Sequence, residues 1–132
     1  MMGVEEIGPR TVGGKLMYNR AVRIDEPRSM LFVSGHEARD DDGNITHRGD
    51  MAGQMRLALR RLGETVSEAG MTMANVVQIR VATTDLATCK ARYGVLMDEL
   101  AAQQCRPASL LAEVSALSDP DMLIEIEAVA VR

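Results

Sequence analysis

The segment at residues 122–131 constrains the fold more than any other, because its side chains change character at every second position. Successive side chains of a strand point to opposite faces, so one face here is wholly apolar and suits a surface beneath helices. The other face mixes two carboxylates with apolar side chains, which fits neither solvent nor a core. We therefore expect another subunit to cover it, with the acids lining a cleft at the junction. The apolar face is Ile124, Ile126, Ala128 and Ala130, and the mixed face is Leu123, Glu125, Glu127, Val129 and Val131.

Strand and helix signals alternate along the rest of the chain. Asp50 and Asp85 are placed to cap two helices, the first ending near residue 69 with Gly70 as a left-handed stop. Because helices that follow strands pack back onto a sheet, this order predicts an α+β fold. We expect a mixed sheet with both helices on one face, in a single domain over residues 1–132. The expected strands are residues 17–24, 29–34, 44–47, 75–82, 109–114 and 122–131.

Composition excludes several classes of protein. The chain has 132 residues and is 46% hydrophobic, but no apolar run approaches the roughly 20 residues of a membrane-spanning helix. Its first residues are acidic where a signal peptide is basic, so we expect a cytoplasmic protein without a membrane partner. A formal charge of −4 and 2% aromatic residues disfavour nucleic acid, which binds basic patches and stacking rings. Cys89 and Cys105 fit neither a metal-binding nor a disulfide pattern; we expect reduced thiols and no metal.

Four segments, taken in order, resemble the Rid/YjgF family of reactive-intermediate deaminases, also described as the endoribonuclease L-PSP family. They are Tyr-Asn-Arg-Ala-Val-Arg at 18–23, Leu-Phe-Val-Ser-Gly at 31–35, Arg-Pro-Ala-Ser at 106–109 and Ile-Glu-Ile-Glu-Ala at 124–128. The resemblance implies a chorismate-mutase-like fold and a homotrimer with a central barrel and ligand clefts between subunits. It also implies cofactor-free hydrolysis of imines and enamines, such as 2-aminoacrylate, to ketoacids and ammonia.

The resemblance implies roles for several residues. Glu125 matches the family's water-positioning glutamate and is the expected catalytic residue. Tyr18 matches a tyrosine near the cleft, and Ser34 with Gly35 matches the Ser-Gly pair that ends the second strand. Ser109 stands where the family has the arginine that binds the substrate carboxylate.

This replacement changes the expected substrate. A guanidinium grips a carboxylate with two charged hydrogen bonds, whereas the Ser109 hydroxyl offers one neutral bond. Loss of such a clamp costs about 2–5 kcal/mol of binding. The substrate is therefore expected to lack an α-carboxylate or to bind in a different pose. Lys90, at the place of the family's cleft asparagine, and Arg106 are candidates to restore a positive charge.

Three functions remain open at this stage. The first is a hydrolase or deaminase of a small imine or enamine, and the second is a non-catalytic trimer that binds a metabolite. The third is a tailoring enzyme, a tautomerase or dehydratase, acting on a reactive intermediate. Glu125 also has a structural alternative, as a salt-bridged strand residue. Ribonuclease activity is disfavoured by the acidic charge, and Asp40, Asp42 and Asn44 are interpreted as a turn because the calcium-loop spacing is broken.

Overall fold

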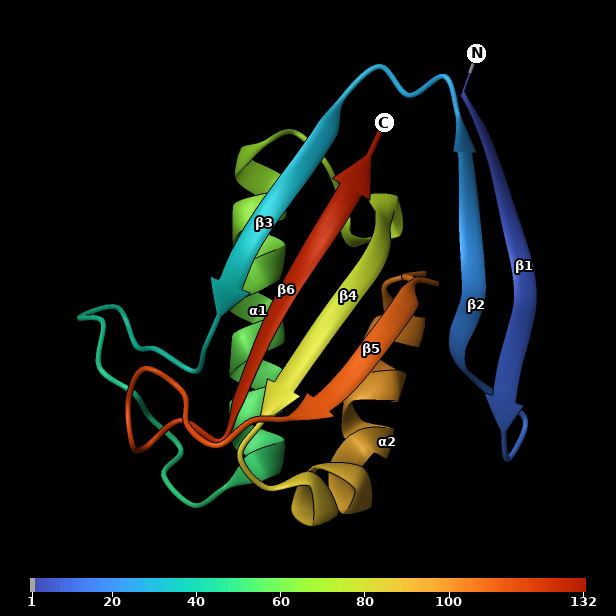
Figure 1. Cartoon of the computed structure of the whole chain (residues 1–132). Coiled ribbons are helices and arrows are strands. Elements are labelled where there is room, and N and C mark those ends of the chain that lie inside the picture. The colour runs from blue at the N-terminus through green and yellow to red at the C-terminus, as the bar shows by residue number, and fades with distance from the viewer. Residues whose placement is uncertain (1) are drawn as a thin grey trace.

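The computed structural model describes residues 2–132 and shows two α-helices on one face of a six-stranded mixed sheet (Figure 1). The sheet order is β1-β2-β5-β4-β6-β3; β5 pairs in parallel with β2 and β4, and the other pairs are antiparallel. This confirms the predicted α+β architecture. The elements are β1 (Gly3–Val12), β2 (Lys15–Asp25), β3 (Met30–His36), α1 (Met51–Glu68), the 3-10 helix η1 (Met73–Asn75), β4 (Val76–Thr83), α2 (Leu86–Ala102), β5 (Ala108–Glu113) and β6 (Ile124–Val131).

Both helices begin at the predicted aspartates. The Asp50 side chain accepts a hydrogen bond from the backbone N–H of Gly53 at 2.9 Å, and Asp85 accepts one from Thr88 at 3.1 Å. Each bond satisfies an N–H that has no partner within the helix. After α1, Gly70 takes a φ of +74°, the left-handed conformation in which glycine carries little strain.

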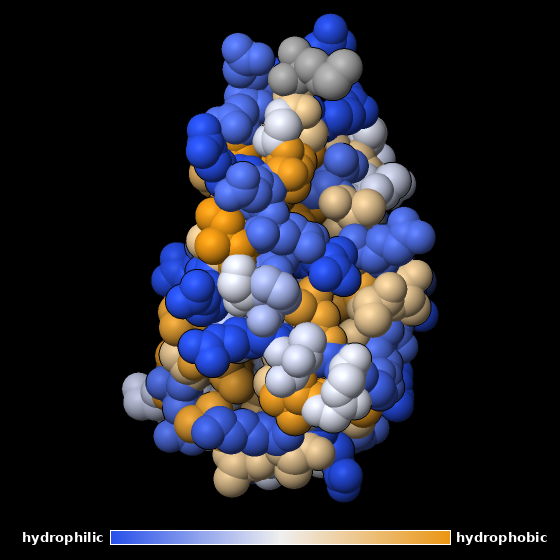
Figure 2. All heavy atoms as spheres, turned by 90° about the vertical axis from the view of Figure 1, so that its right-hand side faces the viewer, coloured by the Kyte–Doolittle hydropathy of each residue, from blue (hydrophilic) through white to orange (hydrophobic). Residues whose placement is uncertain are grey.

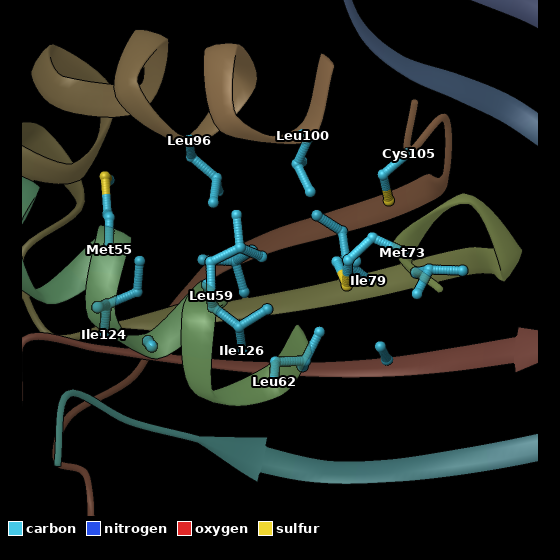
Figure 3. Close-up of a cluster of buried hydrophobic side chains, with 14 of the residues drawn as sticks. Met55, Leu59, Leu62, Met73, Ile79, Leu96, Leu100, Cys105, Ile124 and Ile126 are labelled. Carbon is cyan, nitrogen blue, oxygen red and sulfur yellow. The ribbon is translucent and has the colours of Figure 1, made fainter. Parts of the chain in front are cut away.

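The core lies between the helices and the apolar face of the sheet (Figure 3). Ile124 and Ile126 of β6 are 0% exposed, as the alternating pattern predicts. Leu59 and Leu62 of α1 and Leu96 and Leu100 of α2 cover them in this cluster. Cys105 belongs to the same core, and burial raises the pKa of its thiol to about 12, so it is protonated and unreactive at neutral pH.

The N-terminal hairpin was not predicted. β1 pairs with β2 through a turn at Gly13 and Gly14, both with positive φ. The hairpin stands at the edge of the sheet, where β2 meets β5 through one register pair, Asn19 with Ala108 (Figure 1). Figure 2 faces this hairpin and shows its apolar side chains in patches separated by hydrophilic ones.

The prediction of a strand at residues 44–47 is wrong. Its only sheet-like contact among the described residues is an isolated bridge between Arg39 and Ile45. The Asp40 side chain instead accepts backbone N–H groups of Asp42 and Asn44 at 3.0 and 2.9 Å, which folds the segment into the predicted turn. Local side-chain bonds of this kind compete with a strand ladder. Within residues 2–132 no helix has the length and apolar character needed to cross a bilayer.

Candidate functional site

The site lies on the face of the sheet that the helices leave open. Alternation along β6 turns Glu125 and Glu127 to this face, opposite the buried isoleucines. The antiparallel register places Ala82 of β4 beside Glu125, and Arg80 beside Glu127. Arg80 and Glu127 form an ion pair, with 3.1 Å between Nη1 and Oε1. The open face therefore carries a row of charged groups along two neighbouring strands.

A hollow of about 230 Å³ adjoins Glu125. Its floor is apolar, with Ala82, Leu110 and Ala112 from the two central strands. Leu110 is 51% exposed, which is unusual for a leucine in the middle of a sheet. Small apolar ligands commonly bind in hollows that combine such a floor with a few polar groups. The residues that line it are Gly35, Arg80, Val81, Ala82, Leu110, Ala112, Val114, Glu125 and Glu127.

Gly35 fixes the position of the Glu125 carboxyl group. The pairing of β3 with β6 is irregular between Val33 and His36, so the backbone at Gly35 approaches β6 closely. A Cβ atom added to Gly35 would overlap the Glu125 carboxyl, so any side chain there would displace it. Gly35, the second residue of the predicted Ser-Gly pair, therefore meets the predicted catalytic glutamate within one chain.

Burial raises the pKa of Glu125 above its ordinary value. The negative charges of Glu37 and Glu127 raise this pKa further, while Arg39 and His36 act against them. A carboxyl with a raised pKa takes up a proton more readily at neutral pH, which suits a general base. Groups with such shifts also occur in ion-pair networks, so the shift supports a catalytic role without assigning one.

The start of β6 is held by two buried polar side chains. Gln54 of α1 is 0% exposed and accepts the N–H of Leu123 at 2.8 Å, while it donates to the carbonyl of Asp121 at 2.8 Å. Thr83 donates its hydroxyl to the carbonyl of Leu123 at 2.7 Å. Both backbone groups of Leu123 are thus fixed two residues before Glu125. Sequence analysis missed Gln54, because a polar residue within a helix carries no signal of what it contacts.

His36 connects the end of β3 to α1. Its Nδ1 lies 2.6 Å from the carbonyl oxygen of Ser34, and its Nε2 lies 2.7 Å from the Thr65 hydroxyl. These contacts hold the strand end from which Glu37 and Arg39 follow, and Arg39 pairs with Glu37 at 3.5 Å. His36 is therefore placed as a structural support beside the site.

The other residues predicted to bind substrate do not all lie beside Glu125. Ser34 is exposed on the open face and lines a neighbouring hollow of about 390 Å³ with Arg80 and Glu127. Ser109 is level with the core residue Ile79 in the β4–β5 register, so it faces the helices, on the other side of the sheet from Glu125.

Tyr18 and Arg106 lie near Ser109, where β2 joins β5. Asn19, next to Tyr18, donates its N–H to the carbonyl of Pro107 at 2.9 Å and its side-chain amide to the carbonyl of Arg106 at 2.9 Å. The Arg106 guanidinium binds both oxygens of Glu6, at 2.8 and 3.0 Å. Within one chain this group remains apart from Glu125.

Lys90 is exposed on α2, in the helix layer. A single chain does not bring it to the Glu125 hollow. No group of three or more potential ligands for a metal ion occurs within residues 2–132. Arg80 was missed by sequence analysis, although the alternating pattern of its strand could have placed it on the open face.

Comparison with known proteins decides the family. The family model described as Endoribonuclease L-PSP matches residues 12–132. The chain belongs to this family. Among curated relatives in the family, a RutC family protein of Synechocystis is 35% identical over 118 residues, covering 86% of this chain and 85% of the relative. A 2-iminobutanoate/2-iminopropanoate deaminase of Rattus norvegicus is 31% identical over 127 residues, covering 94% and 84%.

Solved structures of family members have the same fold. The Rid family protein YyfB of Yersinia pestis superposes with a TM-score of 0.80 at 26% identity, over 98% of both chains. TdcF of E. coli, solved with bound serine, gives a TM-score of 0.72 at 28% identity, over 95% of this chain and 93% of its own. The resemblance noted in the four sequence segments is confirmed at the level of family and fold.

Proposed function

We propose that this protein is a cofactor-free hydrolase that converts a small imine or enamine to a carbonyl compound and ammonia, with Glu125 as the catalytic residue. Its relatives support the reaction class, because curated members at 31% identity include the rat deaminase and a 3-aminoacrylate deaminase of Acinetobacter baylyi. The observation that carries the proposal is the Glu125 carboxyl, half-buried against Gly35 with a raised pKa, beside a hollow with an apolar floor.

The chemistry needs one proton acceptor and one water molecule. The reacting species is the iminium ion, formed when an imine takes up a proton from the medium at nitrogen or an enamine takes one up at carbon. The Glu125 carboxylate takes a proton from water as the water oxygen bonds to the iminium carbon. The proton then passes to the nitrogen of the resulting carbinolamine. The carbon–nitrogen bond breaks, ammonia leaves, and the hydroxyl proton returns to the medium as the carbonyl forms. A positioned general base of this kind contributes about 10²–10⁴-fold to the rate.

A homotrimer is the second part of the proposal. Phe32 is 73% exposed and Met30 is 55% exposed, both on β3 beside the open face. Apolar side chains gathered on a sheet face are typical of a surface that another chain covers. In a trimer, the Tyr18, Arg106 and Ser109 group of one chain would complete the Glu125 hollow of its neighbour. Such a cleft would desolvate Glu125 further and raise its pKa more.

The test is an assay with imines made in solution from amino acids by an amino-acid oxidase, with imine decay followed spectroscopically. Glu125→Gln should lower turnover by about 10²-fold or more. Glu99→Gln is the matched control, since Glu99 is also half-buried but lies on α2 in the helix layer. Full activity of Glu125→Gln would contradict the proposal. If the native protein binds an imine or another small metabolite but does not turn it over, the binding-protein alternative is favoured.

Ser109→Arg tests the shifted substrate. If the cleft is shared as proposed, the added arginine should raise the rate with 2-aminoacrylate by about 30-fold or more, because it restores a charged two-point contact to the carboxylate. The comparison uses native protein and variant on the same panel of imines. An unchanged substrate preference would show that Ser109 lies outside the cleft.

A further inference from the structure

We propose that Arg80 binds the carboxylate of the substrate, in a pose displaced from Ser109. This inference rests on the proposed hydrolysis at Glu125 and adds the group by which the substrate is recognised. Lys90 and Arg106 were the residues expected from the sequence to replace the positive charge of the family's arginine. Neither reaches Glu125 in a single chain.

Arg80 and Glu125 line the same hollow of about 230 Å³. Arg80 is level with Glu127, and Glu125 is level with Ala82, so one two-residue repeat separates the arginine from the glutamate along the strands. That repeat is roughly 6.5–7 Å, which places a carboxylate-binding group and a general base at the two ends of a short ligand. Among the described residues that line this hollow, Arg80 alone is cationic.

The Arg80 guanidinium has donors to spare for a ligand. Its ion pair with Glu127 runs from Nη1 to Oε1 at 3.1 Å, with side chains that are 58% and 44% exposed. A guanidinium has five N–H donors in a planar fork, so one contact does not use its two-point binding geometry. Exposed pairs of this kind are weak, and a ligand carboxylate can therefore compete with Glu127.

The other nearby cations are committed elsewhere. Arg106 donates its Nε–H to both oxygens of Glu6 on β1, at 2.8 and 3.0 Å, and does not line this hollow. Arg39 contacts Glu37 at 3.5 Å and also donates to the carbonyl of Gly43 at 2.7 Å. The floor beside Arg80 is made of Ala82, Leu110 and Ala112, which suits the short alkyl chain of a three- or four-carbon imino acid.

The test measures binding of the stable product analogue 2-oxobutanoate, and of its uncharged amide, by NMR titration of the full-length protein. Arg80→Met should weaken binding of the acid by about tenfold or more and leave the amide unchanged. Arg60→Met is the control, because Arg60 is also an exposed arginine paired with a glutamate, Glu64, at 3.9 Å, but on α1. Arg80→Lys keeps the charge without the fork and should lie between native protein and Arg80→Met, which provides a test if the methionine variant does not fold.

Glu127→Gln should have the opposite effect. Removing the counter-charge of Arg80 should tighten binding of 2-oxobutanoate by about threefold or more. Equal effects of Arg80→Met on acid and amide would overturn the inference, as would the absence of saturable 2-oxobutanoate binding by the native protein. Arg80-dependent binding in a protein without imine turnover would support the inference and contradict the proposed hydrolysis. Turnover that does not depend on Arg80 would support the proposed hydrolysis and contradict the inference.

Discussion

The two faces of the sheet are built from alternate residues of the same strands, yet they have different roles. On the covered face, Ile124 and Ile126 are 0% exposed beneath the helices. On the open face, Glu125 lies between these two in sequence and carries a raised pKa, beside the exposed Leu110. The covered face stabilises the fold, whereas the open face holds the Glu125 carboxyl, whose charged form is disfavoured by burial. The difference shows how a single strand can serve both purposes, because its side chains alternate in direction.

The largest expected effect comes from the covered face. Ile126→Ala should lower the free energy of unfolding by about 2–5 kcal/mol, because it leaves a cavity in a fully buried cluster. Urea denaturation of the native and variant proteins measures the difference. Val4→Ala on β1 is the control: Val4 is 55% exposed, and the change should stay within about 0.5 kcal/mol. Equal losses at both positions would remove the contrast between core and periphery.

Phe32→Gln tests whether the open face is an interface. Covering this ring is worth about 1.5–3 kcal/mol per chain, so the variant should dissociate at protein concentrations where the proposed trimer of the native chain persists. Sedimentation velocity measures the mass of both. A native protein that is monomeric at every concentration would contradict the assembly part of the proposed function.

Gly35→Ala tests the contact between the two predicted site residues. The added methyl group would overlap the Glu125 carboxyl, so we expect a loss of about 1–3 kcal/mol in the free energy of unfolding. Turnover should fall with it, because Glu125 must move. The double variant Gly35→Ala with Glu125→Ala removes the overlap and should recover most of the stability. Failure to recover would place the cause in the backbone instead.

Glu125→Gln should produce a small, pH-dependent gain in stability. Because folding raises the pKa of Glu125, the folded state retains this proton to higher pH than the unfolded state does. The ionised carboxylate therefore destabilises the protein once the pH rises above the unfolded pKa, and the cost is complete above the folded pKa. The variant should match native stability in acid and exceed it at neutral pH. Thermal unfolding across that range, with Glu99→Gln as control, measures the trend.

Much of the fold could be predicted from periodicity and caps. The pattern of residues 122–131 placed Ile124 and Ile126 in the core and Glu125 and Glu127 on the open face, although Val131, expected on the mixed face, is only 2% exposed. Asp50, Asp85 and Gly70 marked helix ends that the structure confirms. β1 was missed because Gly8, Pro9 and two adjacent glutamates make it a poor strand by propensity. Its pairing with β2 overrides that propensity, and the Gly13-Gly14 turn was the signal that could have revealed the hairpin.

The candidate site was only partly predictable. Glu125 and Gly35 came from matching short segments to a family, and the structure places them in contact. Arg80 and Gln54 could not be assigned, since their importance depends on which strand or loop lies beside them. Ser109 is a further example. Its place in the sequence predicted a ligand contact, but within one chain it faces the opposite side of the sheet from Glu125.

The amino-acid sequence by itself determined which side chains share a face, because the periods of strand and helix follow from backbone geometry alone. The tertiary structure decided which faces and charges meet. The pairing of β4 with β6 set Arg80 beside Glu127, and the irregular end of β3 brought Gly35 against Glu125. Those neighbours arise from contacts between segments distant in the chain, which register and packing fix together and which no local pattern encodes.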